Sequence, residues 1–528
     1  MSPPPPLSYH IPRCPSPSQE TRVKYDIAII GAGSAGATLA ARLSQDPNLS
    51  VLLLDEGPYF SSIEQFPEAV RTGYGNISRL TGDHISAFDS RMNSHQPWNK
   101  TLWRGRVMGG SSAINGAFFI RGVPEDFDGW AADGNPEWSY LKVLPSFRRI
   151  ETDTDFGGDF HGKDGPMPIR RVPFDKMLPT AKFFYQACKD MGYPYMPDIN
   201  DPQAQGLCLN PVNDVAGLRI NTAMAYLNPN HHRLNLTLKG QAKARRILFK
   251  GKRAVGVEVI SGGQSFKVDA SEVVLSSGAV GSPFLLLHSG IGPAAQLKKL
   301  GMKVIHNLPG VGENLRNHLY SMVRYQHLRP HEAHFDKRQI ILRYTSSASK
   351  RPKDVTINPD FRGSEETPPQ LWLNPTIELP ASAGRLRLTS ADFDAPPEID
   401  FNAVHPHDLE RLREGVRMCI KIGAHPAFKG IAGPRIAPDD SHLASDKSLD
   451  EWILRNIAGS QHQSGTCKMG PASDPTAVVD QYGRVHGLQN LRVCDASIMP
   501  NVVSANPNAS TIMIGERMSE LIKQTLGK

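Results

Sequence analysis

Four residues near the N-terminus have the types and spacing of a turn that binds a phosphate group. Gly31, Gly33 and Gly36 belong to the run GAGSAG, in which Ser34 follows the second glycine. In such a run the first glycine allows a tight turn, the second lets the backbone approach a pyrophosphate, and the third lets a helix pack closely on a strand. The free N–H groups at the start of that helix would then face the phosphates.

Two acidic residues stand where such a fold places a ribose. Asp55 and Glu56 follow the apolar run VLLL at 51–54. A carboxylate there accepts hydrogen bonds from ribose hydroxyls and argues against a 2′-phosphate. The run YDIAII at 25–30 predicts a buried parallel strand, 37–44 predicts a helix, and 51–54 predicts a second strand. This βαβ unit predicts a bound dinucleotide, but the motif alone does not distinguish NAD from FAD.

Later segments supply further glycine turns and strand ends. The turn from Gly109 to Ser112 can wrap amides around a phosphate or the edge of a flavin, and a helix is expected after Ser111. Taken alone, this turn is more typical of an ordinary loop. The other predicted elements are a strand at 273–275 followed by Gly278, a helix that opens at Ser282-Pro283 and ends at Gly290, a strand at 491–494 that leads into Asp495, and an amphipathic helix from Ser510.

These segments, in this order, resemble the glucose–methanol–choline (GMC) oxidoreductase family, whose members bind FAD. The resemblance extends from Tyr25 to Ile522 and includes PGVGENLRNHL at 309–319 and VVDQYGRVHGLQNLRVCDASIMP at 478–500. It implies an α/β fold in which a Rossmann-like FAD-binding domain is interleaved with an α+β substrate-binding domain, an antiparallel sheet flanked by helices. The expected parts are a disordered Pro-rich arm at 1–22, a FAD-binding region with part of the substrate domain at 23–318, a mainly substrate-binding region at 319–460, and a C-terminal FAD-binding and catalytic segment at 461–528.

The resemblance also implies which residues contact FAD. Asp55 stands where most relatives have Glu. Ile114 stands where some relatives carry a histidine that attaches FAD covalently, so non-covalent FAD is expected. The expected cofactor-binding residues are Gly31, Gly33, Ser34, Gly36, Asp55, Glu56, Arg106, Gly109, Gly110, Ser111, Asn115, Gly116, Gly278, Asp495, Ala496, Asn506 and Pro507.

A histidine and an asparagine match the catalytic pair of the family. His462 suits removal of a hydroxyl proton because an imidazole titrates near neutrality, and the hydride would pass to flavin N5. Asn506 could donate a hydrogen bond to the alcohol oxygen. The expected reaction is oxidation of an alcohol, preferably primary, to the aldehyde. Five other histidines are expected to be structural: His288, His318, His405, His425 and His486.

Several points stay open at this stage. Gln461 and Gln463 flank His462; they could indicate a hydroxyl- or carboxyl-bearing substrate, or could simply bond the backbone. The segments 59–100 and 318–371, which vary most among relatives, should build the substrate wall. Oxygen or another acceptor could reoxidise the flavin. Some relatives use the same scaffold for lyase, cyclase or photodecarboxylase chemistry, and a flavin-binding protein without catalysis is a further alternative.

Composition excludes other classes of protein. The chain has 528 residues, of which 39% are hydrophobic and 21% charged, so wholesale disorder is excluded. The net charge of +7 is scattered, so no nucleic-acid partner is expected. No run of eighteen apolar residues exists, so no transmembrane segment is expected. The N-terminus lacks an apolar leader, which predicts a cytoplasmic location. Six cysteines without a CxxC pair predict free thiols and no metal site.

Overall fold

A parallel sheet carries the N-terminal motif. The computed structural model describes residues 24–72, 82–329, 339–362 and 368–525, so the predicted arm at 1–22 and parts of the expected substrate wall lie outside the described residues. The strands of this sheet are β1 (Lys24–Ile30), β2 (Val51–Leu54), β11 (Leu236–Lys239), β12 (Lys243–Lys250), β13 (Arg253–Ser261), β14 (Gln264–Leu275) and β26 (Leu491–Val493). β1 lies between β2 and β14 and runs parallel to both, while β12 and β13 add an antiparallel edge.

Parallel pairing brings the ends of distant segments together. β11 pairs in parallel with β2, and β26 pairs in parallel with β14. The residues that follow β1, β2, β14 and β26 therefore meet at one edge of the sheet. They are Gly31, Asp55, Ser276 and Cys494, the last followed by Asp495. Ligands of open α/β sheets bind at such an edge.

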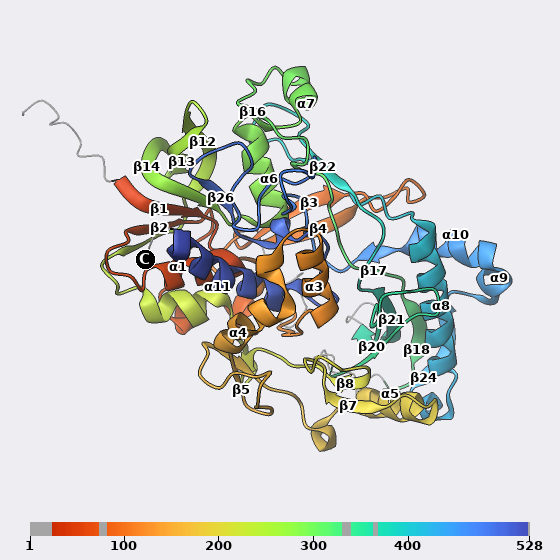
Figure 1. The fold of residues 1–528 in the computed structure, drawn as a ribbon. Coiled ribbons are helices and arrows are strands. Elements are labelled where there is room, and N and C mark those ends of the chain that lie inside the picture. The colour runs from red at the N-terminus through yellow and green to blue at the C-terminus, as the bar shows by residue number, and fades with distance from the viewer. Residues whose placement is uncertain (1–23, 73–81, 330–338, 363–367, 526–528) are drawn as a thin grey trace, which may run out of the picture.

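A second, mainly antiparallel sheet forms the other half of the molecule (Figure 1). Its strands are β7 (Tyr195–Asp198), β8 (Gly206–Leu209), β17 (Leu319–Tyr320), β18 (Val323–His327), β19 (Ile340–Tyr344), β20 (Val355–Arg362), β21 (Gln370–Ile377), β24 (Ala432–Ala437) and β25 (Ala458–Gly459). β7 and β8 precede most strands of this sheet by more than a hundred residues, so the two halves are interleaved in sequence. This confirms the predicted fold class.

The described α-helices pack on strands or against one another. They are α1 (Ser34–Leu43), α2 (Glu68–Thr72), α3 (Pro124–Ala132), α4 (Tyr140–Ile150), α5 (Pro179–Asp190), α6 (Gly278–His288), α7 (Ala294–Lys299), α8 (Pro406–Gly423), α9 (Asp440–Leu443), α10 (Asp446–Asn456) and α11 (Pro507–Thr525). α1 packs against α11 beside the parallel sheet, whereas α5 and α8 pack on the antiparallel sheet (Figure 1). Within the described ranges, no helix has both the length and the apolar character needed to cross a bilayer.

Short strand pairs connect these parts. They are β3 (Ile85–Ser90) with β4 (Lys100–Gly105), β5 (Glu151–Asp153) with β6 (Met167–Ile169), β9 (Asp214–Val215) with β10 (Leu218–Arg219), β15 (Ile291–Gly292) with β16 (His306–Asn307), and β22 (Arg385–Arg387) with β23 (Glu398–Asp400). β3 and β4 form an antiparallel pair, and β4 leads into the glycine turn at 109–110.

Two predicted helices differ from those observed. The helix expected after Ser111 is a single 3₁₀ turn over Gly110–Ala113, entered through Gly109 and Gly110 at φ of +104° and +53°. The helix expected to open at Ser282-Pro283 begins at Gly278, so Pro283 lies inside α6. Pro283 cannot donate to the carbonyl four residues earlier, and that carbonyl, of Ala279, accepts a hydrogen bond from Thr466 Oγ1 at 2.7 Å instead.

The last helix also begins earlier than predicted. α11 starts at Pro507, not at Ser510. Proline is suited to the first position of a helix because its fixed φ is helical and its missing N–H would have no partner there. The shift places Asn506, one residue before the helix, at its entrance.

Candidate active site

A cavity of about 960 Å³ lies between the first sheet, at the edge where its parallel strands end, and one face of the second sheet. Every expected cofactor-binding residue except Gly36 and Gly109 lines it, as do His462 and Asn506. Both exceptions have structural roles. A Cβ on Gly36 would lie 1.9 Å from the Gly31 carbonyl oxygen, and Gly109 N donates to the Ala32 carbonyl oxygen at 2.8 Å.

Two glycine turns meet at the entrance to α1. Gly31 has φ of +101°, and a Cβ there would lie 2.5 Å from the Ser276 carbonyl oxygen. A Cβ on Gly110 would lie 2.7 Å from Gly33 Cα, so the turn at 109–110 crosses directly over the first turn. No side chain caps α1, and its first turn contains no acidic residue. Its N-terminal N–H groups therefore remain available to an anion in the cavity.

Asp55 is held rigidly at the end of β2. Its Oδ2 accepts a hydrogen bond from Ala32 N at 2.8 Å, and its Oδ1 accepts one from Gly57 N at 2.8 Å. Burial raises the pKa of Asp55 to about 6, although these two backbone N–H groups oppose the shift. The neighbouring Glu56 is exposed. Of the two acidic residues, Asp55 therefore has the fixed geometry needed for recognition.

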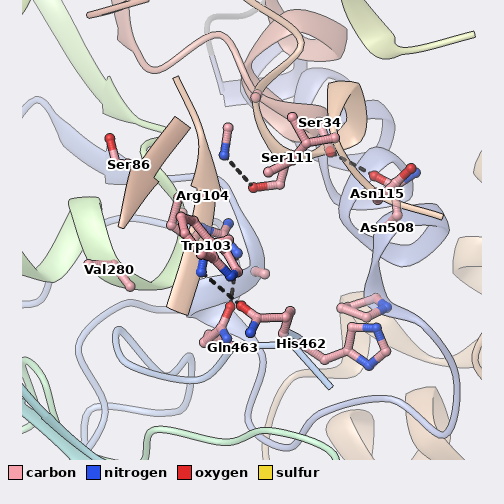
Figure 2. Close-up of a pocket in the computed structure, with 18 of the residues that line it drawn as sticks. Ser34, Ser86, Trp103, Arg104, Ser111, Asn115, Val280, His462, Gln463 and Asn508 are labelled. Atoms are coloured by element: carbon pink, nitrogen blue, oxygen red, sulfur yellow. Dashed lines mark hydrogen bonds between the residues drawn. The ribbon is translucent and has the colours of Figure 1, made fainter. Parts of the chain in front are cut away.

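The N-termini of α1 and α11 are joined across the cavity. Ser34 Oγ donates to Asn508 Oδ1 at 2.7 Å, and Asn508 Nδ2 has no hydrogen-bond partner among the described residues. Ser111 Oγ accepts a hydrogen bond from Gly105 N at 3.2 Å. Figure 2 shows Ser34, Ser111 and Asn508 on one side of the pocket, with the imidazole of His462 farther along it.

His462 and Asn506 come together as the sequence predicts. Asn506 Nδ2 lies 3.1 Å from His462 Nε2. The backbone N–H of His462 donates to Asn317 Oδ1 at 2.9 Å, which fixes the main chain at this point. An amide nitrogen only donates, so Nε2 of His462 carries a lone pair and can accept a proton.

His318, expected to be a structural histidine, lies directly against His462. Its Nδ1 lies 2.7 Å from Nδ1 of His462, and its Nε2 lies 2.8 Å from the carbonyl oxygen of Val503. The ring is fully buried. The motif NHL at 317–319 contained this histidine, but only the fold brings it to His462, 144 residues later.

Glu378 lies beside this pair of histidines. This buried carboxylate follows β21, and its Oε2 lies 3.1 Å from Nδ1 of His318. No local pattern singles it out, because its neighbours in sequence read as an ordinary strand end. Its position beside the site follows from the pairing of β17 with β21.

The glutamines that flank His462 have different partners. Gln461 Oε1 accepts from Trp103 N at 2.9 Å, and its Nε2 donates to the Thr101 carbonyl oxygen at 3.1 Å, so Gln461 bonds the backbone of β4. Gln463 Oε1 accepts from Arg104 Nη1 at 2.9 Å (Figure 2). Gln463 Nε2 is buried and has no partner in the described part of the chain.

Comparison with known proteins decides the family. Models of the GMC oxidoreductase family match residues 25–320 and 380–515. The mitochondrial choline dehydrogenase of Homo sapiens is 35% identical over 96% of this chain and 91% of its own length. The oxygen-dependent choline dehydrogenase of Pseudomonas entomophila (strain L48) is 36% identical, over 95% and 94%. The chain belongs to the GMC oxidoreductase family.

Solved structures agree with this assignment. Pyridoxine 4-oxidase from Mesorbium loti superposes with a TM-score of 0.87 at 28% identity, over 94% of this chain and 99% of that one. This GMC oxidoreductase is therefore an FAD-dependent enzyme that acts on the CH–OH group of a small molecule.

The residues of this GMC enzyme fit FAD. The crossed glycine turns leave the backbone bare where a pyrophosphate would approach, since the nearest atom to a Cβ on Gly33 is Gly110 Cα at 3.9 Å. The uncapped N-terminus of α1 suits the phosphates. Nδ2 of Asn508 and Nε2 of Gln463 are buried donors without an acceptor among the described residues, so both can donate to a bound cofactor. This donor-rich lining matches the oxygen-rich pyrophosphate and flavin edge.

Two expected cofactor ligands bond other parts of the chain. The carboxylate of Asp495 accepts from Gly278 N and Ser497 N, both at 2.8 Å, and so ties β26 to α6. Arg106 Nη2 donates to the Gly82 carbonyl oxygen at 2.7 Å. Both residues line the cavity, and their contact with FAD remains a prediction.

The remaining titratable candidates lie apart from this chemistry. His288 packs against Phe284 and Phe393, and burial lowers its pKa to about 4. Cys467 and Cys494 are free and fully buried, and burial raises the pKa of both thiols well above the usual value. These residues behave as core side chains.

Proposed function

We propose that this enzyme oxidises a small primary alcohol to the aldehyde, with His462 as the base that removes the hydroxyl proton and with FAD bound non-covalently. The observation that carries the proposal is the 3.1 Å contact between Asn506 Nδ2 and His462 Nε2 inside the cofactor cavity. It leaves an unprotonated nitrogen and an amide donor side by side. Ile114, which has no side chain able to attach a flavin, supports the non-covalent assignment.

The pair divides the work on the hydroxyl group. His462 Nε2 accepts the proton, and Asn506 Nδ2 donates a hydrogen bond to the oxygen as negative charge develops on it. Asn506 cannot compete for the proton because an amide nitrogen is not basic. Bound FAD supplies the acceptor for the two electrons that leave the carbon.

The second sheet gives the substrate wall its chemistry. Side chains of β20 and β21 at every second position line the cavity, as expected for one face of a sheet. In the described part of these strands they are Thr356, Asn358, Asp360, Trp372, Asn374 and Thr376; Phe361 lines the cavity as well, and none of these residues is a lysine or arginine. Asn374 Oδ1 is buried and has no partner among the described residues. This wall favours a neutral or cationic alcohol over one that carries a carboxylate, because nothing on it would balance a negative charge.

The ribose-binding role of Asp55 gives a direct prediction. We expect Asp55→Ala to weaken FAD binding ~10-fold to ~100-fold, because a hydrogen bond to a charged group contributes ~1.5–3 kcal/mol. Fluorescence titration of the apoprotein with FAD measures the effect. Asp159→Ala is the matched control: this exposed acidic residue lies outside the cavity and should leave the affinity unchanged. Equal losses in both variants would remove the specific role of Asp55.

An anaerobic panel of alcohols tests the reaction itself. The holoenzyme is mixed with choline, other primary alcohols and their secondary counterparts, and the flavin absorbance is followed. We expect primary alcohols to bleach the flavin. Product formation without bleaching would instead indicate lyase or cyclase chemistry. Bleaching by secondary alcohols alone would overturn the preference for primary ones. Admission of oxygen, or of an artificial acceptor, to the bleached enzyme then identifies what reoxidises it.

A further inference from the structure

A chain of buried polar contacts starts at Nδ1 of His462, the ring nitrogen that does not face Asn506, and ends at Glu378 and Thr356 in the cavity wall. Nδ1 of His462 lies 2.7 Å from Nδ1 of His318, which in turn lies 3.1 Å from Oε2 of Glu378. Thr356 Oγ1 donates to Oε1 of Glu378 at 2.6 Å. His318 is fully buried and Glu378 is 7% exposed, so the contacts are shielded from bulk water.

The partners at the two ends of this chain fix the positions of the protons. The carbonyl of Val503 only accepts, so Nε2 of His318 carries a proton. The amide nitrogen of Asn506 only donates, so Nε2 of His462 does not. The proton of His462 is therefore on Nδ1 and is donated to the unprotonated Nδ1 of His318. Both rings are neutral before substrate reacts.

We propose that Glu378, acting through His318, is the buried countercharge that stabilises the protonated form of His462 during alcohol oxidation. The inference rests on the proposed function of His462. When the alcohol O–H bond breaks, its proton forms a new bond to Nε2 of His462, and the ring becomes a cation. The proton on its Nδ1 stays hydrogen-bonded to Nδ1 of His318, and the Glu378 carboxylate, 3.1 Å from that nitrogen, balances the positive charge on the pair. The O–H bonding pair stays on the alcohol oxygen, so this step involves no oxidation or reduction.

Strand pairing holds the carboxylate in place. Glu378 N donates to the Asp354 carbonyl oxygen at 2.9 Å, just before β20 begins, and this fixes the main chain that carries Glu378. Arg343 on β19 also interacts electrostatically with Glu378, but its guanidinium donates to the carbonyl oxygens of Ile199 and Ser504. Because Glu378 acts through His318, it is a positioning residue.

Glu378→Gln tests the role of the charge, since glutamine keeps the shape and the acceptor for Thr356. We expect normal FAD content, kcat lowered about tenfold or more, and KM little changed. The acid limb of the kcat/KM profile should move to lower pH by about one unit, because loss of the carboxylate makes the His462 cation less stable. A higher KM with unchanged kcat would instead make Glu378 a substrate ligand and would overturn the proposal.

Two further variants separate charge from packing. Thr356→Val removes a hydrogen bond to Glu378 but keeps its charge, so the acid limb should not move to lower pH. In a double-mutant cycle, Glu378→Gln should have little further effect once His318 is replaced by Gln. Additive effects would show that Glu378 does not act through His318.

A measurement without turnover distinguishes this inference from the proposed function. NMR titration of ring-¹⁵N-labelled histidines, with His462 assigned by its loss in His462→Ala, should show a lower pKa of His462 in Glu378→Gln than in the wild type. An unchanged pKa would overturn the countercharge even if alcohols are oxidised. If the pKa of His462 is lowered but none of the tested alcohols bleaches the flavin, the coupling between Glu378 and His462 stands and the proposed function is overturned.

Discussion

His462→Ala should retain FAD and lose at least ~10²-fold in kcat, because a positioned general base typically contributes that much to proton transfer. The side chain lies at the end of the cavity, and none of the glycine turns that fit the dinucleotide depends on it. Removal of the imidazole leaves Asn506 as a donor but provides nothing to accept the hydroxyl proton. The measurements are the flavin absorbance per chain and the steady-state rate on the best alcohol of the panel.

The matched control for this variant is His232→Ala. His232 is exposed and lies outside the cavity, so its loss should change neither FAD content nor rate. A wild-type rate in His462→Ala would show that another group removes the proton. A colourless protein would show instead that His462 supports cofactor binding, which the geometry does not predict.

The second large effect concerns stability and comes from a buried ionic cluster around His161. Nδ1 of His161 lies 2.9 Å from Glu151 Oε1 and 3.1 Å from Asp153 Oδ2, and Nε2 lies 2.8 Å from Asp198 Oδ2. Arg121 pairs with Glu151, and Arg171 pairs with Asp153 and Asp198. A protonated imidazole and two guanidinium groups thus balance three carboxylates. The cluster joins β5 to β7, which lies at the edge of the second sheet.

His161→Ala should therefore lower the free energy of unfolding by ~3–5 kcal/mol near pH 6, because it leaves a buried carboxylate unpaired. Burial opposes the charge on His161, but hydrogen bonds to Asp153, Asp198 and Glu151 outweigh it and raise the pKa of His161 to about 10. Because folding raises the pKa of His161, its charge stabilises the folded state fully below the pKa of the unfolded chain, near 6.5. This stabilisation is lost as the pH rises through about 10. The deficit of the variant should thus shrink between pH 7 and pH 10.

Urea unfolding of both proteins at pH 6, 8 and 10 measures this deficit, with His232→Ala as the exposed control. A deficit of the same size at pH 6 and pH 10 would assign the effect to lost packing rather than to charge. No deficit at any pH would show that the carboxylates find other partners. Either outcome would remove His161 as the ionic link between β5 and β7.

Much of the fold and of the cofactor site followed from local sequence, because the signals are short. The glycine run at 31–36, the apolar runs that form β1 and β2, and the acid at 55 each report backbone requirements of their own position. Helix boundaries did not all follow from local sequence, since Pro283 is locally typical of the first turn of a helix but lies inside α6. Only the tertiary contact with Thr466 satisfies the carbonyl that Pro283 leaves free and allows α6 to begin at Gly278.

The sequence by itself determined the dinucleotide turn, the GMC resemblance and the choice of His462 and Asn506, since each depends on residue types at short spacing or on motifs in order. Only the tertiary structure decided that His318 contacts His462, that Glu378 contacts His318, and that Gln461 bonds the backbone of β4. These contacts join residues that are distant along the chain and lie on different strands and loops. Which side chains meet there depends on strand pairing and packing, and a linear pattern carries no record of either.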